Sequence, residues 1–286
     1  MRPFLRVVAS GILVCTCGVL SSPLVAARAQ APQSRTSASR LTPQEIETFL
    51  LKARIGSTRS AGGGVTDSQR ATLTDDTLTH DAQIQTVDVS KARFEAGAAS
   101  EVNFRDSYRY NIAAYRLSRL LGMDNVPVSV DRRVDGKPAA VTWWIDDVAM
   151  TEKERVAKKT MGPQPLRTSS QLQMMQVFDE LIQNKDRNPG NIVWTSDWKL
   201  WLIDHTRAFR TGKELANPDD LKRCDRVFLT QLRQLTPKAL NDATDKVLSP
   251  FEREALLARR DLLVRHFDGR IALVGESNVL FDPLTW

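Results

Sequence analysis

Apolar residues recur along the first half of the chain at both helical and strand spacings. One amphipathic helix is predicted to begin at Thr42-Pro43, where a capping residue precedes a proline, and a second spans 106–121 and stops at Gly122. Short apolar segments between and after them predict strands at 53–57, 70–73, 79–87, 126–130 and 139–145. The first half is therefore expected to combine a small sheet with two helices.

The second half is predicted to be mainly helical. Three helices are expected to begin where a cap residue precedes a proline, at Asn217-Pro218, Thr236-Pro237 and Ser249-Pro250. The order of elements predicts an α+β fold, with a mixed lobe over 41–147 and a mainly helical lobe over 148–286.

The segment 178–205 reads FDELIQNKDRNPGNIVWTSDWKLWLIDH and combines a helix face, a polar loop and two apolar strands. A turn at Ser196-Asp197 predicts that the two strands form a hairpin, which brings Asp204 back beside Asn191. A carboxylate and a neutral amide oxygen are ligands that suit a hard cation. The alternative is structural: Asp186 and Asn191 belong to an Asn-Pro-Gly turn, and Asp204 caps the segment after it.

Two motifs in this segment resemble those of the phosphoinositide 3-/4-kinase-like enzymes, to which the secretory-pathway Golgi kinases and the HipA toxin kinases are similar. Asp186-Arg187-Asn188-Pro189-Gly190-Asn191 is similar to their Asp-Arg-His-x-x-Asn loop, and Leu202-Ile203-Asp204-His205-Thr206 to their Asp-Phe-Gly segment. The stretch 111–122 with Val126-Pro127-Val128 resembles their regulatory helix and the next strand, so the resemblance covers about 53–209.

This resemblance implies a two-lobed protein-kinase-like fold that binds ATP together with Mg²⁺ or Mn²⁺. By resemblance, Asp186 is the catalytic base, and Asn191 and Asp204 are the metal ligands. Lys185 or Arg187, adjacent to the base, could supply positive charge to the phosphates, although both could equally be solvated loop cations.

The chain departs from the resembling families in the nucleotide site. Asn111 stands where they have a helix glutamate, and the strand at 79–87 contains no lysine to pair with it. Lys91, just past that strand, and Glu101 are the nearest substitutes for this pair.

Gly62, Gly63 and Gly64 lie between the first two expected strands. Glycines allow backbone amides to approach an anion closely, which favours a loop over the nucleotide phosphates. The segment does not match the Gly-x-Gly-x-x-Gly or Walker patterns, so a flexible hairpin tip is the alternative.

The first 29 residues are typical of a secretory signal peptide. Arg2 and Arg6 precede an apolar stretch over 7–20, and Ala27-Arg28-Ala29 provides small residues before a cleavage site. The apolar stretch is shorter than a membrane span, so no stable span is expected after its removal. We therefore expect a protein exported to the periplasm or the extracellular space.

Two further expectations concern the same end of the chain. Cys17 followed by Gly18 raises a lipid anchor as an alternative, although Val14-Cys15-Thr16 is a poor approach to a lipoprotein cleavage site. The polar segment 30–40 is expected to be a disordered linker.

Composition excludes several functions. Removal of 1–29 takes three arginines and no acidic residue, so the net charge falls from +6 to +3, which is too mild to favour nucleic acid as a partner. Cys224 is then the only cysteine, and a buried small side chain is expected there. His80 and His266 have no second His or Cys at ligand spacing, which disfavours a zinc site. A Gly-x-Ser-x-Gly elbow is absent, which disfavours a serine hydrolase.

The expected activity is metal-dependent transfer of the γ-phosphoryl group of a nucleotide to a hydroxyl of a protein, a sugar or a lipid. Two alternatives stay open. The missing lysine and Asn111 favour a catalytically silent kinase-fold module that binds a partner, whereas the same metal ligands would also serve an adenylyl transferase.

Overall fold

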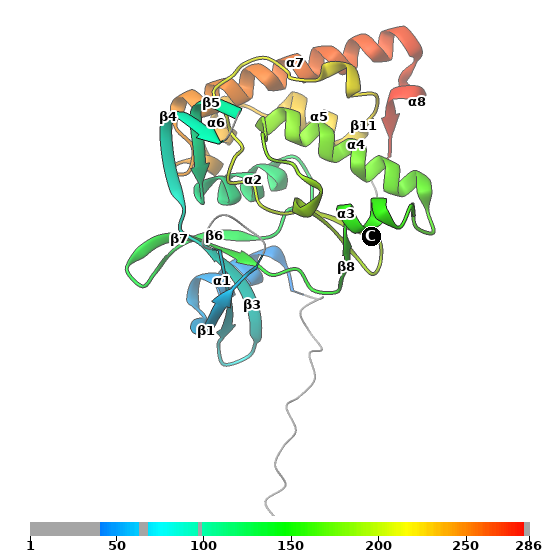
Figure 1. Ribbon diagram of the computed structural model, residues 1–286. Coiled ribbons are helices and arrows are strands. Elements are labelled where there is room, and N and C mark those ends of the chain that lie inside the picture. Colours follow the sequence, from blue (N-terminus) through cyan, green and yellow to red (C-terminus); the bar gives the residue numbers. More distant parts are fainter. Residues whose placement is uncertain (1–40, 63–67, 97–98, 283–286) are drawn as a thin grey trace, which may run out of the picture. The chain divides into compact units, whose positions relative to one another are not determined.

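The first half of the chain forms a five-stranded antiparallel sheet (Figure 1) with strand order β1-β2-β3-β7-β6. In the computed structural model the described residues are 41–62, 68–96 and 99–282. The expected signal peptide and linker, as well as Gly63 and Gly64, lie outside them. The strands of the sheet are β1 (Arg54–Ser60), β2 (Gln69–Thr74), β3 (Thr79–Gln85), β6 (Ser129–Val134) and β7 (Lys137–Trp143).

Helix α1 (Pro43–Lys52) covers one face of this sheet. It begins with the predicted cap: Thr42 and Glu45 form a capping box, and a proline occupies the first turn. Phe49 and Leu50 are buried, and Arg132 of β6 donates to the carbonyl of Leu50 at 2.8 Å. The apolar positions of this segment therefore form the face of α1 that packs against the sheet.

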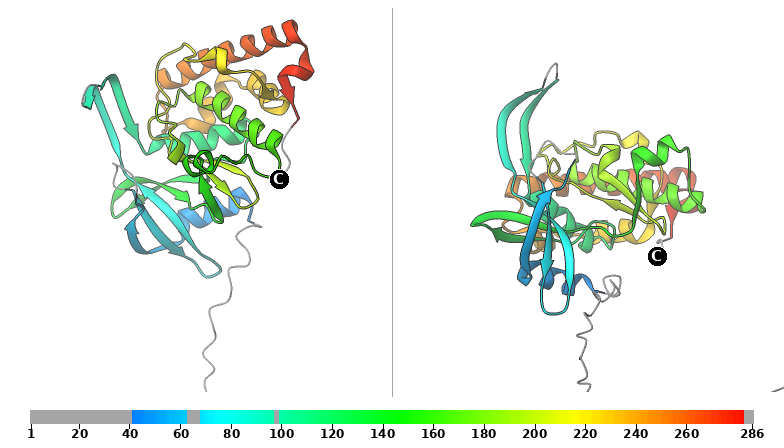
Figure 2. Two further views of the ribbon diagram at one scale, coloured as in Figure 1. Left: turned by 45° about the vertical axis from the view of Figure 1, so that its right-hand side comes forward. Right: turned by 60° about the horizontal axis from the view of Figure 1, so that its bottom comes forward.

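A long hairpin, β4 (Asp88–Ala96) and β5 (Ala99–Ser107), is inserted between β3 and α2 (Arg109–Leu120). It forms a separate two-stranded sheet and extends from the small sheet beside the helical part of the chain (Figure 2). The hydrophobic pattern did not predict it. Both faces of much of β4 are exposed, so this strand carries little apolar signal.

The rest of the chain is mainly helical and contains a second, three-stranded sheet with order β10-β9-β8. Its first elements are β8 (Val148–Thr151), α3 (Glu152–Ala157), α4 (Pro165–Ile182), the 3-10 turn η2 (Pro189–Asn191), β9 (Ile192–Thr195) and β10 (Leu200–Leu202). The later elements are η3 (Pro218–Asp220), β11 (Cys224–Asp225), α5 (Arg226–Gln234), α6 (Pro237–Thr244), α7 (Pro250–Val274), α8 (Glu276–Val279) and β12 (Leu280–Phe281).

Two of the three helix starts predicted from proline are confirmed. Thr236 and Ser249 cap α6 and α7 through their side chains, each bonded to a backbone N–H three residues on. The prediction at Asn217-Pro218 was wrong about length, because only the three-residue turn η3 forms there and its Asn side chain makes no capping bond. Cys224 is fully buried, as predicted, and burial raises the pKa of its thiol.

The core of the helical part lies between α4 and α7 and is filled by Phe178, Leu256, Leu263 and Phe267. A buried hydrogen bond of 2.5 Å from the Tyr110 hydroxyl to Glu252 joins α2 to α7. Within the described part of the chain, none of the helices is both long and apolar enough to cross a membrane. The architecture confirms the predicted α+β fold with a small β-sheet lobe and a mainly helical lobe.

Candidate functional site

The loop between α4 and β9 is fixed by Arg187. Its guanidinium forms an ion pair with Asp179 at 2.9 Å and donates to the carbonyls of Asn191 at 2.9 Å and Ile203 at 2.7 Å. The side chain is only 8% exposed. These contacts hold the loop in position. Because Arg187 is engaged within the protein, we do not propose that it binds phosphate.

Asp186 and Asn191 are joined through the backbone of this loop. The Asn191 side-chain Nδ2 donates to the carbonyl of Asp186 at 3.1 Å, which leaves its Oδ1 as an available oxygen ligand. Within the described ranges, the Asp186 carboxylate receives one long contact, 3.5 Å from Nδ2 of Asn188. It is half-buried, and the neighbouring Arg187 is bound to a different carboxylate. Asp186 is therefore not part of the ion pair that fixes Arg187.

The hairpin of β9 and β10 brings Asp204 to this loop, as predicted. Leu200 pairs with Trp194 and Leu202 with Ile192, and the Ile203 N–H donates to the carbonyl of Asn191 at 3.1 Å. Asp204 itself adopts a left-handed backbone conformation with φ of 53°, which is uncommon outside glycine and occurs often at functional sites.

Among the described residues, Thr206 is the residue whose hydrogen bonds orient the Asp204 carboxylate. Thr206 donates to its Oδ1 through its hydroxyl at 3.0 Å and through its N–H at 3.4 Å. These bonds leave Oδ2 as a potential cation ligand, close in the fold to the Asn191 amide.

A third aspartate, Asp106, was not predicted as a site residue. It stands near the end of β5, where the Ser107 N–H donates to the carbonyl of Thr206 at 2.8 Å. Burial raises the pKa of the Asp106 carboxyl, and the negative charges of Asp204 and Asp186 raise it further, while the nearby Thr206 hydroxyl and the charge of Arg207 lower it. Its Oδ1 is buried without a hydrogen-bond partner in the part of the chain that the structure describes. We refer to Asp106, Asp186 and Asp204 as the site aspartates.

A pair of neutral amides links the small sheet to α2. Asn111 Nδ2 donates to Gln85 Oε1 at 2.5 Å, and Asn111 Oδ1 accepts the N–H of His205 at 2.7 Å. Gln85 and Asn111 are 2% and 5% exposed. Sequence reasoning identified Asn111 as the departure, but it missed Gln85, which lies at the end of the lysine-free strand.

Lys91 and Glu101 are not paired in the structure. On the hairpin, Lys91 lies opposite Phe104, and its ammonium group stands 5.1 Å above the ring of Phe94. Glu101 forms ion pairs with two arginines that follow Asp204, Arg207 and, at 2.5 Å, Arg210. The expectation that Lys91 pairs with Glu101 rested on their proximity in the sequence. The strand register instead places Lys91 opposite Phe104 and Glu101 opposite Phe94.

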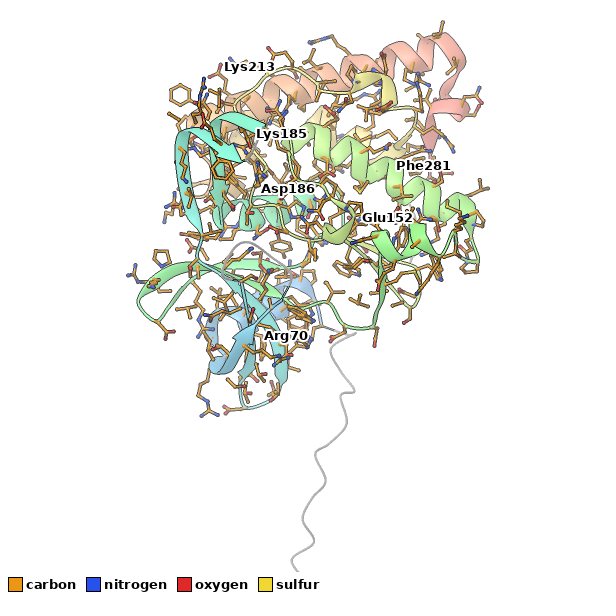
Figure 3. The ribbon with its side chains drawn as sticks, viewed as in Figure 1. Arg70, Glu152, Lys185, Asp186, Lys213 and Phe281 are labelled. Carbon is orange, nitrogen blue, oxygen red and sulfur yellow. The ribbon has the colours of Figure 1, made fainter. Side chains whose placement is uncertain are left out.

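Of the remaining predicted site residues, the structure describes Lys185 and Gly62. Lys185 is exposed next to Asp186 (Figure 3) and lines a cavity of about 330 Å³ between α4 and the segment 216–221. Gly62 follows β1 with a positive φ of 75°, and its N–H donates to Ser60 Oγ at 3.3 Å. Gly63 and Gly64 are outside the described residues.

The chemistry of the oxygen donors fits a divalent metal that arrives with phosphate. Asn191 and Asp204 supply an amide and a carboxylate oxygen, whereas a set of three His, Cys, Asp or Glu side chains able to hold a metal alone is absent from the described residues. Mg²⁺ usually takes one or two protein carboxylates and completes its shell with phosphate oxygens and water. The Asp106 carboxyl lies near enough to Asp204 and Asp186 for their negative charges to raise its pKa.

Solved structures of kinases have a similar fold. The structure of hydra Fam20 with sugar matches with a TM-score of 0.63 and 14% identity, over 85% of this chain and 93% of that chain. The Golgi casein kinase with Mn/ADP bound matches with a TM-score of 0.60 and 15% identity, over 83% and 78%. The proinflammatory kinase CtkA of Helicobacter pylori matches with a TM-score of 0.50 and 12% identity, over 78% and 98%.

No protein-family model and no curated protein matches the sequence. At identities of 12–15% the structural likeness shows the fold alone. The Golgi-kinase part of the expected resemblance agrees with these neighbours, whereas they do not confirm the phosphoinositide 3-/4-kinase and HipA parts. The chain has a kinase-like fold.

Proposed function

We propose that this protein is a metal-dependent phosphotransferase that moves the γ-phosphoryl group of ATP to a hydroxyl. The observation that supports the proposal is the convergence of Asp186, Asn191 and Asp204 at one end of the β9–β10 hairpin within a kinase-like fold. Phosphoryl transfer requires little covalent chemistry from a protein, and such a set of groups can position the nucleophile and neutralise charge.

In the proposed reaction, the Asp186 carboxylate accepts the proton of the acceptor hydroxyl. The hydroxyl oxygen forms a bond to the γ-phosphorus while the bond to the β,γ-bridging oxygen breaks, so ADP leaves with that oxygen. Asn191 and Asp204 would hold Mg²⁺ or Mn²⁺, which neutralises the developing charge on the phosphate oxygens when it is bound. The Thr206 bonds to Asp204 keep its carboxylate in one orientation for this role.

The acceptor belongs to one of three classes, namely a protein serine or threonine, a sugar, or a lipid headgroup. Two solved neighbours are relevant to the ligands, since the hydra Fam20 structure contains sugar and the Golgi casein kinase contains Mn/ADP. We further propose that residues 1–29 direct export, so that the protein acts outside the cytoplasm in a compartment supplied with nucleotide.

The buried pair of Gln85 and Asn111 favours a second candidate, a catalytically silent module that binds the metal–nucleotide complex. A neutral amide pair provides no charge to draw the phosphates into an attacking geometry, whereas a lysine would. In that case the carboxylates would bind a metal–nucleotide complex that is not consumed.

Product analysis of purified protein incubated with ATP and Mn²⁺ separates these functions. A phosphotransferase releases ADP, an adenylyl transferase releases pyrophosphate, and a silent module leaves ATP unchanged while still binding it. Asp204→Ala should abolish ADP release, and Asp242→Ala, which removes an exposed carboxylate of α6, should retain it. Release of pyrophosphate, or undiminished ADP release from Asp204→Ala, would overturn the proposal.

A further inference from the structure

The site aspartates together with a nucleotide concentrate negative charge that a cation of the protein must offset. ATP brings its own phosphate charges, and Asp106 already lies under the influence of Asp186 and Asp204. Arginine is well suited to this task because its planar guanidinium donates to two phosphate oxygens at once. The exposure and hydrogen bonds of each nearby arginine indicate which one can bind phosphate.

Two other arginines near the site aspartates are more deeply buried than Arg207. Arg187 is 8% exposed and bonded to Asp179 and to two backbone carbonyls. Arg210 is also 8% exposed; it forms an ion pair with Glu101 and donates to the carbonyl of Asn103 at 2.8 Å. At 8% exposure, both guanidinium groups are less accessible to a ligand than that of Arg207.

Arg207 differs from both in its greater exposure. Its side chain is 26% exposed, and its Nη2 group is paired with Glu101. Its Nε is buried and has no hydrogen-bond partner in the part of the chain that the structure describes. An unsatisfied buried donor is costly, and a ligand that bonds to it recovers that cost.

The position of Arg207 also favours contact with a ligand at the site aspartates. It follows Asp204 by three residues, and its carbonyl accepts the N–H of Lys185 at 3.4 Å, next to Asp186. Its charge acts on the carboxyl of Asp106. The segment after Asp204 thus carries Arg207 close to the site aspartates. No residue of the small sheet is needed to supply this positive charge.

Glu101 and Phe104 hold the guanidinium in place from the hairpin. The Arg207 guanidinium stands 5.0 Å from the ring centroid of Phe104, and Glu101 is shared with Arg210. One carboxylate between two guanidinium groups leaves these three side chains with a net positive charge, which offsets part of the negative charge of the site aspartates.

We propose that Arg207, oriented by Glu101 of the inserted hairpin, binds the phosphate groups of the nucleotide. The inference deepens the proposed function and rests on it. It makes the β4–β5 hairpin part of the nucleotide site, because Glu101 belongs to β5.

Calorimetric titration with Mn²⁺·ATP and with adenosine tests this proposal. Arg207→Met keeps an aliphatic stem on Phe104 and leaves Glu101 bonded to Arg210, so the fold should be retained, and a melting curve checks this. The control is Arg233→Met, which removes an exposed arginine of α5 paired with Asp268. Arg207→Lys serves as the second variant, because it keeps the charge and loses the bidentate geometry.

We expect Arg207→Met to weaken Mn²⁺·ATP binding by roughly tenfold to a hundredfold, the range for loss of a hydrogen bond to a charged group. Arg207→Lys should lie between this variant and the wild type, and adenosine binding should be the same in all. If the wild type binds Mn²⁺·ATP and Arg207→Met binds it equally well, the inference is overturned and the proposed function stands. If the wild type does not bind Mn²⁺·ATP, both are overturned.

Discussion

The side chain of Asn111 joins the small sheet to the segment that follows Asp204, because it donates to Gln85 Oε1 at 2.5 Å and accepts the His205 N–H at 2.7 Å. Helix α2 therefore holds the proposed metal-binding segment through a neutral amide. In this fold the link between sheet, helix and loop does not depend on an ion pair.

Asn111→Ala should destabilise the protein by roughly 2–4 kcal/mol, because it leaves one buried acceptor and one buried donor unpaired. Chemical denaturation measures this as a lower midpoint with an unchanged slope. The exposed Asn241 of α6 provides the matched control, and Asn241→Ala should stay within about 0.5 kcal/mol of the wild type. A cost for Asn111→Ala as small as that of the control would show that the amide network is not structural.

Asp186→Asn should lower the turnover number by about 10²- to 10⁴-fold, the usual contribution of a general base, and leave the dissociation constant for Mn²⁺·ATP unchanged. The split between turnover and binding arises because Asp186 acts on the acceptor proton, whereas Asn191 and Asp204 hold the metal. Steady-state kinetics and a binding titration on the same variant check it. Turnover at the wild-type rate would remove Asp186 from the mechanism.

The fold should lose stability as the pH falls below about 6.5, and His205 should account for part of the loss. This histidine is 1% exposed, and burial lowers its pKa well below the usual value, with a smaller effect from Arg187. The unfolded chain then binds a proton that the native state does not, so the free energy of unfolding falls by about 1.4 kcal/mol per pH unit between 6.5 and the lowered pKa.

A comparison with His205→Gln isolates this contribution. The difference in unfolding free energy between wild type and variant should be constant above pH 7.5. Below pH 6.5 the wild type should lose stability relative to the variant. Parallel curves from pH 7.5 to 5 would contradict the assignment.

Asp106→Asn should raise the melting temperature of the metal-free protein at pH 7. The native pKa of Asp106 is raised, so its ionised form is disfavoured by burial and by the charges of Asp204 and Asp186. The wild type regains stability relative to the variant as the pH falls through the raised pKa towards 3.8, the ordinary value, where the difference disappears.

The same substitution should weaken Mn²⁺ binding, because the site loses negative potential. Melting curves at pH 7 and pH 4, with and without Mn²⁺, test both effects. A variant that is less stable than the wild type at pH 7 without metal would show that Asp106 is a structural residue.

Local sequence patterns predicted the elements that depend on neighbouring residues. The turn at Ser196-Asp197 between two apolar segments was enough to bring Asp204 beside Asn191, because a short hairpin has few alternative registers. The proline-capped helices at Thr236 and Ser249 were found for the same reason. The β4–β5 hairpin was missed because its exposed faces lack an apolar alternation.

The contacts that complete the site could not be read from the sequence. Asn111 reaches the His205 N–H across 94 positions, and Glu101 reaches Arg207 across 106. No spacing rule connects such residues, since only the folded arrangement of hairpin, helix and loop brings them together. Proximity along the chain favoured Lys91 as the partner of Glu101, but the strand register placed Phe104 opposite it.

The central claim is that Asp204 binds a metal–nucleotide complex, and a thermal-shift titration of the wild type beside Asp204→Ala tests it most directly. Ligand at a hundredfold excess over its dissociation constant stabilises the native state by about 2.7 kcal/mol. We predict an increase in melting temperature that requires both ATP and Mn²⁺, is lost in Asp204→Ala and is retained in the exposed-site control Asp242→Ala. No increase in the wild type, or an equal one in Asp204→Ala, would contradict the account.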